Sequence, residues 1–289
     1  MSIRLTTAAL LTGVLVAATA SAQAPALRLP RASQNASVSQ TIGTTDLAVK
    51  YCRPGVKGRA IWGALVPYDK PWRTGANEVT SFTTSDDITV EGQPLPAGTY
   101  GLVTIPGATT WTVVFSKQKE MWGAYDYDPK QDQLRVTVTP QAADMTEWMQ
   151  FGFDVTSPTT CELALRWEKL RVPVRIAVDV NARVLASARA AVSGAKPDDW
   201  RTRYNAANWA FGAEMVPDET AKWANDALAL QSNFQTLSLS AKLMQRAGKT
   251  KEAIAQMQKA IVSGKADKGI NPDMITPAEK LLAEWQAKK

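Results

Sequence analysis

The residues best suited to chemistry or recognition gather in one glycine-containing stretch, from residue 51 to residue 78. It mixes cations, aromatic rings, an amide and a carboxylate without the apolar period of a helix or strand, which is typical of loops that present a site. With two aromatics farther along the chain, the candidate ligand-binding residues are Arg53, Lys57, Arg59, Tyr68, Trp72, Arg73, Asn77, Glu78, Trp122 and Tyr125. The cations could hold an anion, and the rings could stack on a sugar or peptide face. Alternatively, the rings close one end of the fold and the cations pair with Glu78, Asp86 or Asp87.

Catalysis has weak support in the sequence. The chain contains no histidine, which excludes Ser-His-Asp triads, Cys-His pairs and histidine metal sites. Glu78 could act as a general acid or base only if a second carboxylate faced it, and Asp126 and Asp128 are candidates. The acidic run 126–132 lacks the glycine and the closing glutamate of a calcium loop. We therefore expect no catalytic residue, no metal and no cofactor.

The two cysteines, Cys52 and Cys161, could form a disulfide in an oxidising compartment. Cys161 shares the alternate spacing of Leu163 and Leu165, which indicates a core-facing position. Cys52 falls on the opposite parity from Leu47 and its alternate neighbours. The spacing alone leaves the pairing open, because the geometry of the two side chains decides it.

The first residues resemble a secretory signal peptide. Arg4 provides a positive start, residues 8–18 an apolar run, and Ala20-Ser-Ala22 a small-residue cleavage site. We expect cleavage near Ala22, a linker over 23–36, and a periplasmic or secreted protein with no stable membrane insertion. A basic excess confined to residues 181–289 is scattered along helical segments, so we expect no nucleic-acid partner.

The hydrophobic pattern divides the remaining chain in two. From 37 to 180, apolar residues alternate with period two between glycine and proline clusters, which predicts an antiparallel β-sandwich or jelly-roll-like domain. From 181 to 289, apolar residues follow helical spacing, which predicts a helical domain. The predicted fold class is thus α+β, with two domains.

The β part carries motifs of a known family. Besides the stretch that begins at Tyr51, these are Leu95-Pro-Ala-Gly-Thr-Tyr100, Trp111-Thr-Val-Val-Phe115 and Trp122-Gly-Ala-Tyr125. In these motifs the sequence resembles bacterial exported proteins with domain of unknown function 2911, over most of residues 30–180. The resemblance implies an architecture and no reaction.

The helical part resembles tetratricopeptide repeats. The residues that match their packing positions are Phe234, Leu237, Ala241, Gly248, Ala253, Met257 and Ala260. The resemblance implies about two degenerate repeats and a capping helix. It implies either a groove for a peptide or a purely structural role, because so few helices provide little groove.

These observations favour an exported, non-catalytic ligand-binding or protein-interaction module, whose partner is an unknown protein or glycan of the cell envelope. One alternative is a hydrolase that cleaves a carbohydrate or cell-wall polymer with paired carboxylates. The other is a structural envelope protein, which predicts that Trp62, Trp72 and Trp122 are all packed inside the fold.

Overall fold

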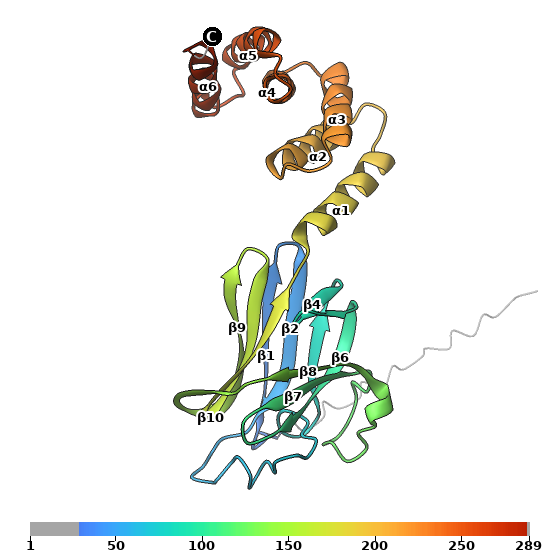
Figure 1. Ribbon diagram of the computed structural model, residues 1–289, viewed down its shortest axis with the longest axis vertical. Helices are drawn as coiled ribbons and strands as arrows, with labels where there is room; N and C mark the ends of the chain where they lie inside the picture. The colour runs from blue at the N-terminus through green and yellow to red at the C-terminus, as the bar shows by residue number, and fades with distance from the viewer. Residues whose placement is uncertain (1–28, 288–289) are drawn as a thin grey trace, which may run out of the picture.

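The computed structural model describes residues 29–287 and divides them into a β part and a helical part (Figure 1). The strands lie within residues 34–177, and six α-helices occupy residues 180–287. The predicted α+β class is confirmed. The predicted signal peptide over residues 1–22 lies outside the described residues.

Ten strands form two antiparallel sheets. They are β1 (Gln34–Ile42), β2 (Thr45–Arg53), β3 (Thr80–Thr84), β4 (Ile88–Val90), β5 (Gln93–Leu95), β6 (Gly98–Pro106), β7 (Trp111–Ser116), β8 (Asp132–Val138), β9 (Gln141–Ser157) and β10 (Thr160–Ala177). One sheet has the order β1-β2-β3-β6-β7-β8, and the other has the order β5-β4-β10-β9. A single hydrophobic core lies between them, to which β2 contributes Leu47, Val49 and Tyr51. The period of two in the sequence therefore reflects which face of each strand points into the core.

Four tryptophans fill one region of this core. Trp62 and Trp72 come from the connection between β2 and β3, Trp111 from β7 and Trp167 from β10. The ring centroids of Trp62 and Trp111 lie 4.9 Å apart at a steep angle, and those of Trp72 and Trp167 lie 5.8 Å apart in a stacked pair. These are the offset and edge-on arrangements that aromatic rings prefer. The irregular connection is thus anchored in the core by its own rings.

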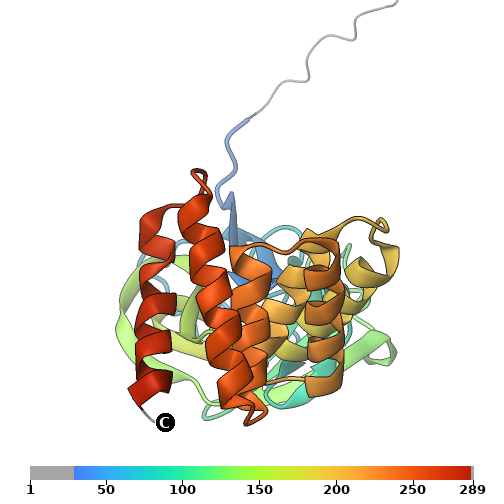
Figure 2. The same ribbon diagram turned by 90° about the horizontal axis from the view of Figure 1, so that it is seen from above.

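The helices form an array beyond the sandwich, with α2 to α6 side by side (Figure 2). They are α1 (Val180–Gly194), α2 (Trp200–Gly212), α3 (Pro217–Leu230), α4 (Phe234–Arg246), α5 (Thr250–Ala266) and α6 (Thr276–Ala287), and the short helical turns η1 (Pro129–Gln131) and η2 (Pro272–Met274) complete the set. Asp179, Asp199 and Asn233 cap α1, α2 and α4 by accepting bonds from free backbone amides. Leu237, Ala253 and Met257 pack together in one cluster, as the repeat spacing requires. Membership of the tetratricopeptide class stays a prediction.

Helix α1 connects the two parts and is fixed at its first turn. Val180 packs over Gly43, where a side chain would clash and where φ is +59°. Arg183 lies 3.0 Å from Asp86 and 3.7 Å from Asp87. These two carboxylates pair with the helix, so they are not the partners of the residue 51–78 cations.

In residues 29–287, none of the helices has the length and apolar character needed to cross a membrane.

Candidate functional site

The structure separates the candidate residues into three groups. The first group is Arg53, Lys57 and Arg59, whose bonds shape the start of the connection between β2 and β3 and join it to strand β9. Arg53 donates from Nε to the carbonyl of Met149 at 2.9 Å, and Arg59 donates to the carbonyls of Val56 and Gly55 within its own turn. The backbone amide of Lys57 donates to Glu147 at 2.9 Å. The two arginine side chains thus bond to backbone carbonyls, and the Lys57 ammonium lies 5.8 Å from the centre of the Trp148 ring. Among the described residues, none of the three cations forms the expected pair with Glu78, Asp86 or Asp87.

The second group belongs to the core or lies apart from the other candidates. Trp72 is 8% exposed, and its Nε1 donates to the carbonyl of Gly75 at 3.0 Å. The expectation that Trp72 stacks on a ligand is therefore wrong, because the buried ring already stacks on Trp167 and meets Trp62 and Trp111 edge-on. Tyr68 is exposed, and its ring lies against Gly63 in the middle of the connection.

The third group comes together as one surface. Glu78 and Trp122 form an isolated antiparallel bridge, and the amide of Gly123 donates to the carbonyl of Asn77 at 3.1 Å. The segments 77–79 and 121–123 are thus paired, although more than 40 residues separate them in sequence. Trp122 is 62% exposed and Tyr125 is 84% exposed. Arg73, Asn77, Glu78, Trp122 and Tyr125 are the candidates that the fold brings together.

Close packing fixes the Trp122 segment on the outer face of the six-stranded sheet. Met121 packs against Val79, Val103 and Val114, in a cluster separate from the main core. Gly101 makes this possible, because a Cβ there would lie 2.2 Å from the carbonyl oxygen of Gln118. A glycine in β6 therefore lets the chain after β7 lie flat on the sheet.

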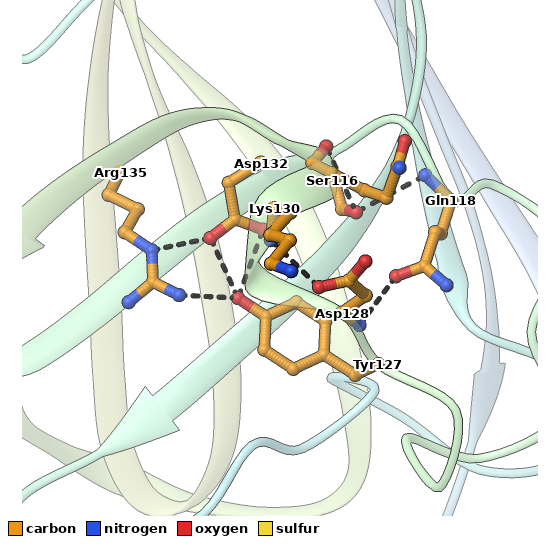
Figure 3. A network of polar contacts seen from close by, with 8 residues as sticks. Ser116, Gln118, Tyr127, Asp128, Lys130, Asp132 and Arg135 are labelled. Atoms are coloured by element: carbon orange, nitrogen blue, oxygen red, sulfur yellow. Dashed lines mark hydrogen bonds and ion pairs between the residues drawn. The ribbon is translucent and has the colours of Figure 1, made fainter.

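A polar network holds the other end of that segment (Figure 3). The Tyr127 hydroxyl donates to Asp132 at 2.8 Å and accepts from Arg135 at 2.7 Å, and Arg135 also pairs with Asp132. Asp128 accepts from the amide of Lys130, and Gln118 accepts from the amide of Asp128 at 2.7 Å. The acidic run 126–132 thus uses Asp128 and Asp132 to shape a turn. In residues 29–287, no three His, Cys, Asp or Glu side chains lie close enough to hold a metal.

An open groove of about 510 Å³ lies beside Glu78, on the outer face of β1, β2 and β3. We call it the outer-face groove, and its lining residues are Asn35, Ala36, Ser37, Lys50, Tyr51, Cys52, Glu78, Val79, Ser81 and Lys119. Sequence reasoning missed most of them. The signal for Asn35, Ser37, Lys50, Cys52 and Ser81 was their outward parity on three strands, whereas Ala36 and Tyr51 have inward positions beside the core. The parity became informative only once the sheet order placed those strands side by side.

Charge at the groove centres on Glu78, its partner Arg31, and the nearby Arg73. Arg31 donates to both carboxylate oxygens of Glu78 at 2.8 Å. A backbone hydrogen bond at Glu78 itself, followed by the bond from Arg31, holds the pKa of this carboxyl below its usual value. Burial lowers the pKa of Arg73, whose buried Nε has no hydrogen-bond partner among the described residues. A half-buried guanidinium with an unused N–H can donate that proton to a ligand oxygen, so it favours an anion.

The two cysteines are free thiols, so they do not form the disulfide that the sequence left open. Cys161 lies in the core between the sheets, where burial raises its thiol pKa to about 11. Cys52 lies on the outward side of β2 and lines the groove, where its Sγ is 3.1 Å from Oδ1 of Asn35 and 3.3 Å from Oε2 of Glu78. The sheet itself separates the two thiols.

The β part is thus an antiparallel two-sheet module with a polar groove and two exposed rings on one outer face. Residues 33–176 match the family described as "Protein of unknown function (DUF2911)", and this chain belongs to that family through its β domain. The comparison with curated proteins and the comparison with solved structures gave no match.

Proposed function

We propose that this protein is an exported, non-catalytic binding module and that the outer-face groove is its ligand site. The observation that carries the proposal is the pairing of residues 77–79 with 121–123, which sets two exposed aromatic side chains beside a polar groove. Exposed rings next to a concave polar surface are a common arrangement for ligand recognition. Trp122 and Tyr125 supply the flat apolar contacts.

The charges around the groove favour an anionic ligand. Lys50 and Lys119 line it, and Arg73 lies near Cys52 and Tyr125. Among the described residues that line the groove, Glu78 is the one carboxylate, and Arg31 already neutralises it. A ligand with a carboxylate or phosphate beside a flat ring face fits this combination. An acidic glycan of the cell envelope has both features and is our leading ligand class.

The hydrolase alternative gains no support from the groove. Paired-carboxylate hydrolysis needs two carboxyl groups about 5–9.5 Å apart, one of them protonated at neutral pH. The described lining supplies Glu78, whose pKa is lowered rather than raised. The described lining therefore offers neither a second carboxylate nor a carboxyl group that is protonated at neutral pH.

Export is part of the proposal and rests on the pattern of residues 1–22. Cell fractionation of the native host, with mass spectrometry of the mature N-terminus, tests it. Cleavage near Ala22 and recovery outside the cytoplasm support export, whereas an intact N-terminus in the cytoplasm contradicts it.

Array binding tests the ligand site. The purified chain is applied to arrays of acidic glycans, neutral glycans and peptides, beside the variants Trp122→Ala and Lys119→Glu. Trp148→Ala and Lys169→Glu are matched controls, because both residues are exposed on β9 and β10 and do not line the groove. We expect acidic glycans to bind, with at least tenfold weaker binding for the groove variants. Preference for an acidic peptide would change the ligand class, and equal losses in the control variants would refute the site.

A further inference from the structure

Arg73 is an unpaired cation at the edge of the outer-face groove. Its segment wraps around the end of β2, because the amide of Ala76 donates to the carbonyl of Cys52 at 3.3 Å. The guanidinium is half-buried, and its buried Nε has no hydrogen-bond partner among the described residues. No Asp or Glu side chain within residues 29–287 pairs with it. A partly buried charge without a partner is costly, so it marks a position where an anion from outside the fold is expected.

The other arginines of the described β part differ from Arg73. All but one pair with a carboxylate or donate to a backbone carbonyl, namely Arg31, Arg53, Arg59, Arg135, Arg166 and Arg171. The remaining one, Arg175, is exposed on β10, where water can satisfy its donors. Within the described β part, Arg73 is therefore the half-buried arginine whose donors remain for a ligand.

A second cationic position lies two residues along β2 from Cys52. Lys50 has the same outward parity as Cys52, and two residues of a strand span about 7 Å. Ser37 of β1 and Ser81 of β3 are the register partners of Lys50, so they flank it on either side. Because neighbouring strands lie about 4.8 Å apart, the row Ser37–Lys50–Ser81 presents one ammonium and two hydroxyls on the groove floor.

Acidic residues near the groove leave these cations unopposed. Glu78 is the one carboxylate of the described lining, and Arg31 donates to both of its oxygens at 2.8 Å. Glu120 and Asp126 adjoin Lys119 and Tyr125 in sequence, but both are exposed and neither lines the groove. The groove therefore has two separate places for an anion, one at Arg73 and one at the row around Lys50.

We propose that the ligand of the outer-face groove is an oligosaccharide with acidic groups on neighbouring sugar units, one bound by Arg73 and another by the row Ser37–Lys50–Ser81. This inference rests on the proposed function, because it takes the groove to be the site of an acidic glycan. A carboxylate suits Arg73, since Nε and a neighbouring Nη can donate to two oxygens in one plane. Lys50 is a point charge, and the hydroxyls beside it supply the further donors that a second acidic group needs.

Calorimetric titration of the full chain with uronic acid oligomers tests whether two positions act together. The probes are galacturonic acid as monomer, dimer, trimer and tetramer, and the fully methyl-esterified trimer, which has the same rings without the charges. We expect the trimer to bind about tenfold more tightly than the monomer, because two linked acidic groups then bind as one ligand. The esterified trimer should bind about tenfold more weakly than the charged one.

Matched substitutions then separate the two positions. Arg73→Lys keeps the charge but removes the planar fork, and Lys50→Gln removes the charge from the row. Arg175→Lys and Lys169→Gln are the controls, because both residues are exposed on β10 and do not line the groove. We expect R73K and K50Q each to lower the affinity for the trimer about tenfold, while the controls bind it as the wild-type chain does. R73K should unfold at the wild-type temperature, because the Nε of Arg73 has no partner within the described fold.

The outcomes separate this inference from the proposed function. If the trimer binds no more tightly than the monomer, or if R73K and K50Q bind the trimer like the controls, the inference is overturned and the groove remains a site for a singly charged ligand. If neither the monomer nor any oligomer binds, the acidic-glycan proposal fails and the inference fails with it. The Nε–H signal of Arg73 in NMR spectra should shift when the trimer binds, and an unchanged signal would also overturn the inference.

Discussion

Replacing Trp72 with alanine tests whether the connection between β2 and β3 is held by the tryptophan cluster. The indole is 8% exposed and contacts Trp62, Trp111 and Trp167. Burial of about 200 Å² of aromatic surface at about 25 cal/mol per Å² corresponds to about 5 kcal/mol, of which alanine retains a small part. The lost bond to the carbonyl of Gly75 adds to the cost. We therefore expect the free energy of unfolding to fall by about 3–5 kcal/mol.

Near-ultraviolet circular dichroism measures this loss, because it follows the packing of the tryptophans during urea or thermal unfolding. The midpoint of thermal unfolding should fall by about 6–20 °C for a domain of this size. Trp122→Ala is the matched control, since that ring is mainly exposed and its loss should change stability by about 0.5 kcal/mol or less. If W72A lost less than about 1 kcal/mol, or no more than W122A, the cluster would not be what holds the connection.

Three further predictions concern titration and reactivity. Arg31→Ala should raise the pKa of Glu78 toward 4.5 in a carboxyl NMR titration, and an unchanged pKa would contradict the pairing. Because the pKa of Glu78 is depressed in the folded protein, its ionised carboxylate stabilises the fold above pH 4.5, and this stabilisation is lost as the pH falls through the folded pKa. Tyr127→Phe should remove the last phenol to ionise in a spectrophotometric titration, because burial, and to a lesser degree Asp132, raises the pKa of Tyr127 to about 12. The neutral phenol stabilises the fold fully below pH 10.0, and this stabilisation is lost as the pH rises through the folded pKa. Loss of a phenol that titrates earlier would refute the assignment. Iodoacetamide should label Cys52, which is 4% exposed and lines the groove, faster than Cys161, which is 0% exposed in the core. Peptide mass mapping over a labelling time course would show this, and equal rates would mean that the core is open at Cys161.

The sequence predicted the division of the chain well because hydrophobic period is a local property. The alternation of Leu47, Val49 and Tyr51 required one buried face, and the structure places all three in the core. The change to helical spacing after residue 180 coincides with the start of α1. The family motifs pointed to the same β region that the family match covers.

The site was predicted less completely because it depends on contacts between distant segments. Glu78 and Trp122 were both candidates, and their pairing does occur. Trp72 was misplaced because a tryptophan in an irregular loop carries no periodic signal that distinguishes a buried ring from an exposed one. Arg31, Lys50 and Lys119 were missed because only the order β1-β2-β3 and the return of the chain over β6 and β7 bring them to one surface.

Amide chemical-shift mapping tests most directly whether the outer-face groove is the ligand site. The strongest array ligand is titrated into the isotope-labelled full chain, and the shifts are followed in two-dimensional NMR spectra. We predict that the largest shifts occur at Ser37, Lys50 and Ser81 and at the indole N–H of Trp122. Shifts concentrated on β9 and β10, with these four signals unchanged, would contradict it.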